Sequence, residues 1–159
     1  VAIDPPASDG AKANACGIVA AGLGADGRCY VLSDRSAKRL SPLKWAERAV
    51  KLCHALDADR VIAEANQGGK MVETVLRQVD ANLPLRLVHA SQGKRARAEP
   101  VAALYEQGRV SHVGALPELE DEMCSMIEDS KSPDRLDALV WAVTELMLKK
   151  RAEPRVWGV

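Results

Sequence analysis

Residues 132–143 have the sequence SPDRLDALVWAV, which predicts the first turns of a buried helix that carries two acids beside its apolar stripe. We expect this helix to span 132–150, with an inward face formed by apolar side chains at helical spacing: Leu136, Leu139, Val140, Val143 and Met147. Asp134, Asp137 and Trp141 follow one another along the flank of that face. Asp134, in the first turn, also complements the helix dipole. An unpaired carboxylate beside a core costs several kcal/mol or takes up a proton, so we expect a cation to neutralise it.

Two more acids end apolar segments elsewhere in the chain. Val1–Asp4 is a strand-like run that stops at Pro5-Pro6, because proline cannot donate a hydrogen bond to a sheet. RVIAEA, 60–65, predicts another strand that ends at Glu64, before the loop NQGG. Carboxylates that converge from separate segments favour hard divalent cations such as Mg²⁺ or Mn²⁺, the ions that serve phosphodiester chemistry.

Each of these acids also has a simpler interpretation. Asp137 pairs with a cation that folding brings close, such as Lys94 or Arg97. Glu64 caps the helix that begins after NQGG, and Asp4 is an ordinary turn residue before two prolines. Spacing alone leaves metal binding and these alternatives open, and the joint occurrence of the three acids favours metal binding.

The order of the expected elements predicts an α/β domain built on a mixed sheet. Asp26-Gly27 tolerates the positive φ of a tight turn between antiparallel strands, whereas the later strands alternate with helices, as parallel strands require. The expected strands are 1–4, 16–23, 28–33, 60–65 and 85–90, and the expected helices are 42–56, 69–79, 98–106, 118–127 and 132–150. We therefore expect one domain over 1–150, with helices on both faces of the sheet, and a C-terminal tail over 151–159.

The charges of the chain balance, with 22 basic and 22 acidic residues, so no overall field draws it to a polyanion. GKRAR, 93–97, supplies a local patch: Lys94, Arg95 and Arg97 are expected in a loop after a strand, where they suit contacts with DNA phosphates. A solvated loop is the alternative. Aromatic residues are only 3% of the chain and offer no row of rings for stacking single-stranded bases, so a duplex is favoured over a single-stranded ligand.

Several other classes of protein are not supported. The four cysteines are scattered without a C-x-x-C pair, which argues against a zinc site. No apolar run approaches the roughly 20 residues of a membrane span and no leader precedes the first strand, so a cytoplasmic location without membrane partners is expected. GGK, 68–70, lacks the upstream glycine and the following Ser or Thr of a phosphate-binding loop, so ATP hydrolysis is not expected.

Four segments, VAIDPP, RVIAEANQGG, SQGKRARAEPVAALYEQGRV and SPDRLDALVWAVTEL, together resemble the nuclease domain of phage terminase large subunits, which package and cut viral DNA. The resemblance runs from Asp4 to about Leu148 and keeps the family's order of motifs. It implies a ribonuclease H-like fold in which Asp4, Glu64 and Asp137 bind two Mg²⁺ or Mn²⁺ ions. Asp134 is then either a further ligand or a residue that orients metal-bound water.

The resemblance also implies an activity and a set of partners. It predicts a metal-dependent endonuclease that cuts concatemeric double-stranded DNA during genome packaging, by two-metal-ion hydrolysis, in the cytoplasm of the host cell. The implied partners are an N-terminal ATPase domain, expected to lie outside this chain, the small terminase subunit and the portal. Two alternatives stay open: a ribonuclease H-type or junction-resolving nuclease, and a non-catalytic docking module of the packaging motor.

Overall fold

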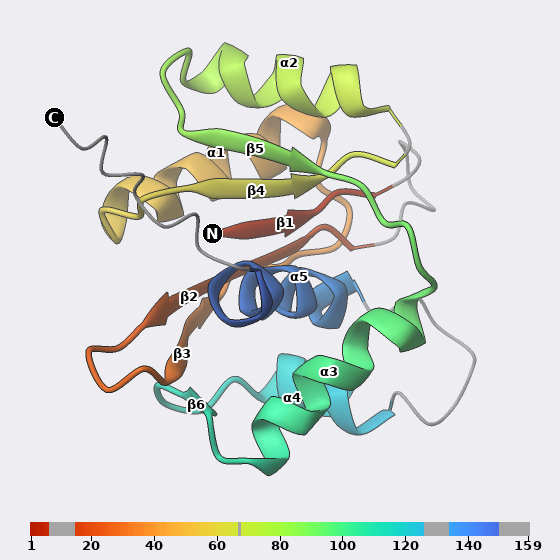
Figure 1. Ribbon diagram of the computed structural model, residues 1–159. Coiled ribbons are helices and arrows are strands. Elements are labelled where there is room, and N and C mark those ends of the chain that lie inside the picture. The colour runs from red at the N-terminus through yellow and green to blue at the C-terminus, as the bar shows by residue number, and fades with distance from the viewer. Residues whose placement is uncertain (7–14, 67, 126–133, 150–159) are drawn as a thin grey trace, which may run out of the picture.

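A mixed sheet runs through the centre of the molecule, and its strand order places β1 and β4 side by side (Figure 1). The computed structural model describes residues 1–6, 15–66, 68–125 and 134–149. The described strands, in the sheet order β5-β4-β1-β2-β3-β6, are β1 (Ala2–Asp4), β2 (Gly17–Leu23), β3 (Cys29–Asp34), β4 (Val61–Glu64), β5 (Leu85–Val88) and β6 (Val110–His112). The described helices are α1 (Pro42–Ala55), α2 (Gly69–Val79), α3 (Lys94–Glu106), α4 (Pro117–Ser125), α5 (Asp134–Val143) and the π-helix η1 (Thr144–Leu148).

The strand directions agree with the prediction of a mixed sheet. β1, β2 and β3 are antiparallel neighbours, and β1, β4 and β5 run parallel to one another. Gly27, in the turn between β2 and β3, has a φ of +76°, as expected for the Asp26-Gly27 pair. Because β1, β4 and β5 are parallel, their carboxyl ends lie along the same edge of the sheet.

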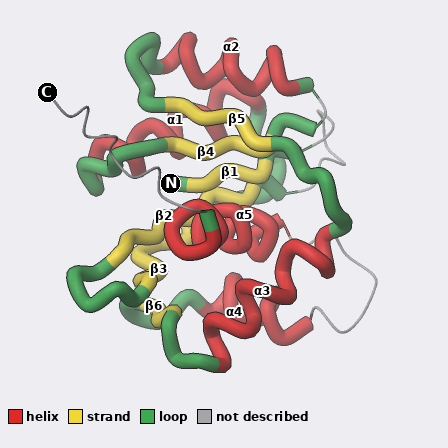
Figure 2. The backbone as a smooth tube through the Cα atoms, viewed as in Figure 1, coloured by secondary structure: helices red, strands yellow, loops and turns green. Residues whose placement is uncertain are grey.

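Helices cover both faces of the sheet, which confirms the predicted layering (Figure 2). α1 and α2 pack on one face, against Ile3, Ile18 and Val61. α5 crosses the other face and packs against Val19 and Val31, together with α3 and α4. This alternation of strand side chains between two cores follows from the two-residue period of a strand. No helix within the described ranges has the length and apolarity needed to cross a lipid bilayer.

The start of α5 lies directly on β2 because residue 17 has no side chain. A Cβ atom at Gly17 would lie 1.9 Å from the main-chain carbonyl oxygen of Asp134 and 3.0 Å from the Cβ of Ala138. Gly17 is also the antiparallel partner of Asp4. The glycine therefore sets how closely the acids of α5 approach the end of β1.

Gly17→Ala is accordingly expected to lower the free energy of unfolding by about 1–3 kcal/mol, because the new methyl group forces α5 away from the sheet. Urea denaturation followed by circular dichroism measures the loss. Gly22→Ala is a matched control on the same strand, since a Cβ there would make an ordinary contact at 3.6 Å with Leu32. Equal losses in the two variants would contradict this account of the packing.

The structure corrects the expected start of the third long helix. The basic segment 93–97 was expected to be a loop, with the helix beginning at 98, but α3 begins at Lys94 and Gly93 is its N-cap. Proline is favoured in the first turn of a helix, so Pro100 favours a start near Ala98. In the folded chain Pro100 lies inside α3, and the turn before it is anchored by contacts with α5 that are described below.

Two further differences concern short or terminal elements. β6 was not expected; it has three residues, lies at the edge of the described sheet and pairs in parallel only with β3, so its stability depends on that neighbour. The last helix was expected to continue regularly, but α5 ends at Val143 and η1 follows as a π-helix. The expected tail over 151–159 lies outside the described residues.

Candidate functional site

Asp4 and Glu64 lie side by side at the carboxyl ends of two neighbouring parallel strands, β1 and β4. The register that pairs Ala2 with Ile62 places Asp4 next to Glu64 two residues later. Ala2 and Ile62 pack against Trp141 of α5. Since side chains two residues apart on a strand point to the same face, both acids also face α5.

Asp137 meets these acids from α5, and two cations of α3 bind it. Its side chain is 4% exposed, and its Oδ2 pairs with the ammonium group of Lys94. The guanidinium of Arg97 lies 3.4 Å from Oδ1 of Asp137 and 3.3 Å from Oε2 of Glu64. The interpretation that folding brings a cation to Asp137 is therefore confirmed, and Arg97 joins Asp137 to Glu64.

Glu64 is held by hydrogen bonds to both of its oxygens. The amide of Asn66 donates to Oε1 at 2.7 Å, and the indole N–H of Trp141 donates to Oε2 at 2.6 Å. Asn66 is itself fixed, because its Oδ1 accepts the main-chain N–H of Ala90. The alternative in which Glu64 caps α2 is wrong, since the N-cap position, Gly68, is left-handed and no side chain caps it.

Asp4 is the least compensated acid of the group. Among the described residues, none forms a hydrogen bond or an ion pair with its carboxylate. Burial, followed by the charges of Asp137 and Glu64, raises the pKa of Asp4 to about 8, although Lys94 opposes the shift. Burial, followed by the charge of Glu64, also raises the pKa of Asp137, although Lys94 and Arg97 oppose this shift.

The raised pKa of Asp4 predicts how the stability of the ion-free protein depends on pH. The folded pKa of about 8 exceeds the reference value of 3.8, so between these values the folded state keeps a proton that the unfolded state has lost. The contribution of Asp4 to the free energy of unfolding is thus expected to fall as pH rises through this window, and to level off above it. Asp4→Asn removes this contribution.

Thermal melts of the protein and of Asp4→Asn in EDTA, recorded across this pH range, measure the effect. The variant is expected to melt above the parent protein by a margin that widens as pH rises and is largest above about pH 8. A margin that stays constant with pH would show that Asp4 ionises normally in the folded protein.

The site contains more acids than bases among the described residues. The charges that influence one another are four carboxylates and two cations: Asp4, Glu64, Asp134 and Asp137, with Lys94 and Arg97. Burial lowers the pKa of Lys94, but its hydrogen bond with Asp137 and the charges of Asp137, Asp4 and Asp134 outweigh burial and raise it. Full ionisation of the acids would therefore leave a surplus of negative charge.

This donor set fits Mg²⁺ or Mn²⁺ in chemistry, because both ions prefer carboxylate oxygens and the four carboxylates outnumber the two cations beside them. The carboxylate of Asp4, which has no hydrogen-bond or ion-pair partner in the described ranges, is consistent with such an ion. Over the described parts of the chain, no group of three or more histidine, cysteine, aspartate or glutamate side chains has the arrangement that a metal ion needs. Both oxygens of Asp137 and one of Glu64 are instead engaged by Lys94 and Arg97.

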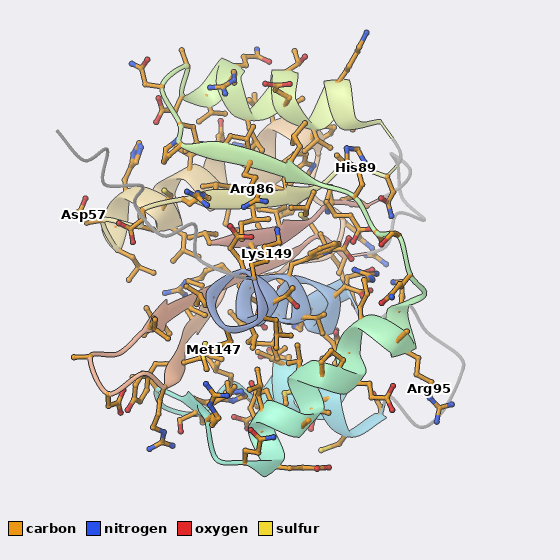
Figure 3. All side chains as sticks on the ribbon, in the orientation of Figure 1. Asp57, Arg86, His89, Arg95, Met147 and Lys149 are labelled. Carbon is orange, nitrogen blue, oxygen red and sulfur yellow. The ribbon has the colours of Figure 1, made fainter. Side chains whose placement is uncertain are left out.

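The three predicted DNA contacts do not share one environment. Lys94 and Arg97 turn toward the acids, with side chains 47% and 11% exposed. Arg95 is exposed and points away from the sheet, beyond the start of α3 (Figure 3). The basic segment is therefore not a uniform phosphate-binding loop, because its members alternate between the acids and solvent around a helical turn.

The amino end of α5 is held by an acid from the preceding helix. Oε2 of Glu122 accepts the main-chain N–H groups of Arg135 and Leu136, at 3.0 and 3.2 Å, and so caps the helix. Asp134 is 7% exposed at this end and lies close enough to Asp4 to raise its pKa further. No local sequence pattern marks Glu122 or Asn66 as a site residue. Glu122 caps a helix that begins 12 residues later, and the bond from Asn66 to Glu64 depends on the side-chain rotamers of both residues.

Comparison with known proteins agrees with this fold. A family model described as a terminase RNaseH-like domain matches residues 1–146, which includes every described residue of the site. No curated protein matches the chain. The six-stranded mixed sheet with helices on both faces is consistent with that family's ribonuclease H-like fold. The match covers most of the chain, and the chain therefore belongs to the terminase RNaseH-like domain family.

Proposed function

We propose that this chain is the metal-dependent endonuclease domain of a terminase large subunit, and that it cuts double-stranded DNA. Family membership supports a nuclease-type domain in general, with DNA and a packaging motor as partners in general. The finer proposal is that concatemeric DNA is cut during genome packaging, together with an ATPase domain, a small terminase subunit and a portal.

The observation that carries the proposal is the convergence of acids from three segments distant in the sequence. Asp4 ends β1, Glu64 ends β4 and Asp137 lies on α5, and the charges of Glu64 and Asp137 both raise the pKa of Asp4. A protein gains nothing in stability from burying surplus carboxylates. Buried acids with strongly shifted pKa values are common at functional sites.

Asp4, Glu64 and Asp137 would hold two Mg²⁺ or Mn²⁺ ions, with Asp134 as a further ligand or an orienting residue. When bound, such ions lower the pKa of a water molecule and stabilise charge on phosphate oxygens. Glu64 is already oriented by Asn66 and Trp141, and Asp4 offers a carboxylate without a described competitor. No described hydrogen bond joins a serine or cysteine to a histidine, so the proposal contains no covalent enzyme intermediate.

Lys94, Arg95 and Arg97 are the proposed contacts with the DNA backbone. Lys94 and Arg97 are suited to hold the phosphate that is cut, because they stand at the carboxylates themselves. Arg95, which faces solvent, is suited to a neighbouring phosphate. Phosphate contacts carry no sequence information, so the isolated domain is expected to cut with little sequence preference.

Cleavage assays with purified protein test the proposal. Supercoiled plasmid is expected to be nicked and linearised with Mg²⁺ or Mn²⁺ and to stay intact with EDTA. Linear duplex, a four-way junction and an RNA–DNA hybrid of equal length form the comparison set. Preference for the junction or the hybrid would replace the terminase-type activity with that of a resolving or ribonuclease H-type enzyme.

A non-catalytic docking module is the second candidate, and one observation favours it: Lys94 and Arg97 already pair with Asp137 and Glu64. In that case the acids would serve only the fold. Thermal melts with increasing Mn²⁺ separate the two functions, because a ligand that binds the folded state raises the melting temperature. An unchanged melting temperature together with intact plasmid would favour the docking module.

A further inference from the structure

Trp141 occupies the position between the sheet and the candidate site. It lies on α5, one helical turn after Asp137, and is 7% exposed. Its ring packs with Ala2 and Ile62, which precede Asp4 and Glu64 by two residues on their strands. The ring therefore lies beneath the carboxylates of both strand ends.

The polar edge of Trp141 acts on Glu64. Its indole N–H is a donor only, and it meets Oε2 of Glu64 at 2.6 Å. Asn66 meets Oε1 at 2.7 Å, so each oxygen of Glu64 accepts one hydrogen bond from a neutral donor. Each carboxylate oxygen has two lone pairs. Oε2 also accepts from the guanidinium of Arg97 at 3.3 Å, so the second lone pair of Oε1 has no described partner, and that of Oε2 becomes available when Arg97 moves away.

The face of the same ring supports Arg97. The guanidinium carbon lies 4.9 Å from the ring centroid, within the range of a cation–π interaction. Arg97 reaches Glu64 and Asp137 from this position, and its Nε is buried without a hydrogen-bond partner in the described structure. The ring thus helps fix the arginine that joins the two acids.

We propose that Trp141 is a positioning residue that fixes the Glu64 carboxylate for divalent-ion binding through its indole N–H. The inference rests on the proposed function, since it concerns the orientation of one of its ligands. A partner that orients a metal ligand typically contributes 10- to 100-fold to metal affinity or activity. The competing explanation is that Trp141 serves only as apolar packing.

Trp141→Phe distinguishes these explanations, because phenylalanine keeps an aromatic ring in the core and removes the N–H donor. Titration of the purified 159-residue chain with Mn²⁺, followed by calorimetry, is expected to show affinity about 10-fold weaker than in the parent protein. Trp45→Phe is the matched control, since Trp45 is 1% exposed in the core on the opposite face of the sheet. It is expected to lower the melting temperature without changing Mn²⁺ affinity.

A second measurement keeps Trp141 and changes its hydrogen-bond partner. In ¹H–¹⁵N spectra, Glu64→Gln is expected to shift the indole N–H resonance of Trp141 and to leave that of Trp45 in place. Unchanged Mn²⁺ affinity in Trp141→Phe, with clear binding by the parent protein, would overturn the positioning role and leave the proposed function intact. A parent protein that binds no Mn²⁺ would overturn both, and an unshifted Trp141 resonance in Glu64→Gln would overturn the positioning role alone.

Discussion

Asp4→Asn is expected to abolish metal-dependent cleavage of plasmid DNA while making the ion-free domain more stable. Burial and neighbouring acids disfavour the ionised carboxylate, so a neutral amide of the same size relieves that cost at neutral pH. The same change removes a proposed metal ligand. We expect at least a 100-fold loss of cleavage rate, about the loss that follows removal of one strong electrostatic group from an active site.

Quantified nicking of supercoiled plasmid and thermal melts of the same preparation measure the two effects. Asp57→Asn is the control, because Asp57 is an exposed acid beyond the end of α1 and away from the site (Figure 3). Asp137→Asn is expected to lose activity as well, but with a smaller gain in stability than Asp4→Asn, since Lys94 and Arg97 already offset part of the cost of burying the Asp137 carboxylate. Full cleavage activity in Asp4→Asn and in Asp137→Asn would remove the proposed catalytic site.

The double variant Lys94→Ala, Arg97→Ala is expected to weaken DNA binding and to strengthen the response to Mn²⁺. Both cations engage oxygens of Asp137 and Glu64 that a divalent ion would need, so they compete with it. Without them, the acids repel one another in the ion-free protein, and an added ion gains more. The increase in melting temperature caused by Mn²⁺ is therefore expected to be larger in the double variant than in the parent protein.

DNA binding by the double variant is measured by fluorescence anisotropy with a catalytically inactive background such as Asp4→Asn. The slope of log affinity against log salt is expected to fall by about 2, because each phosphate contact contributes about 0.9. Arg95→Ala is the matched control: it is expected to reduce that slope by about 1 and to leave the Mn²⁺ response unchanged. Unaltered DNA affinity at low salt in the double variant would show that Lys94 and Arg97 are not phosphate contacts.

The positions of the acids could be predicted from sequence because local chemistry sets them. Pro5-Pro6 ends the first strand directly after Asp4, and the loop after 60–65 ends the fourth strand near Glu64. The two-residue period of strands and the apolar stripe of the last helix then turn these acids and Asp137 toward one another. Their convergence follows from the fold, whereas their role as metal ligands stays a prediction.

The surroundings of the acids could not be predicted because they depend on contacts distant in the chain. Lys94 and Arg97 are both fixed by one acid, Asp137, which lies 43 and 40 residues away from them in the sequence. These contacts help hold the first turn of α3, which local signals assign to a loop. Glu122 caps α5 from another helix, which no capping pattern within α5 reveals. The hydrogen bond from the indole N–H of Trp141 to Glu64 depends on the rotamer of Trp141. The apolar periodicity of the helix predicts only that this side chain is buried.

Anomalous diffraction from a crystal soaked in Mn²⁺ shows whether Asp4, Glu64 and Asp137 together bind divalent ions. We expect anomalous peaks at about 2.1 Å from carboxylate oxygens of these three residues, with Lys94 and Arg97 displaced from Asp137. A Mn²⁺-saturated crystal in which both cations still contact Asp137, and in which no peak lies within coordination distance of Asp4, would contradict this expectation.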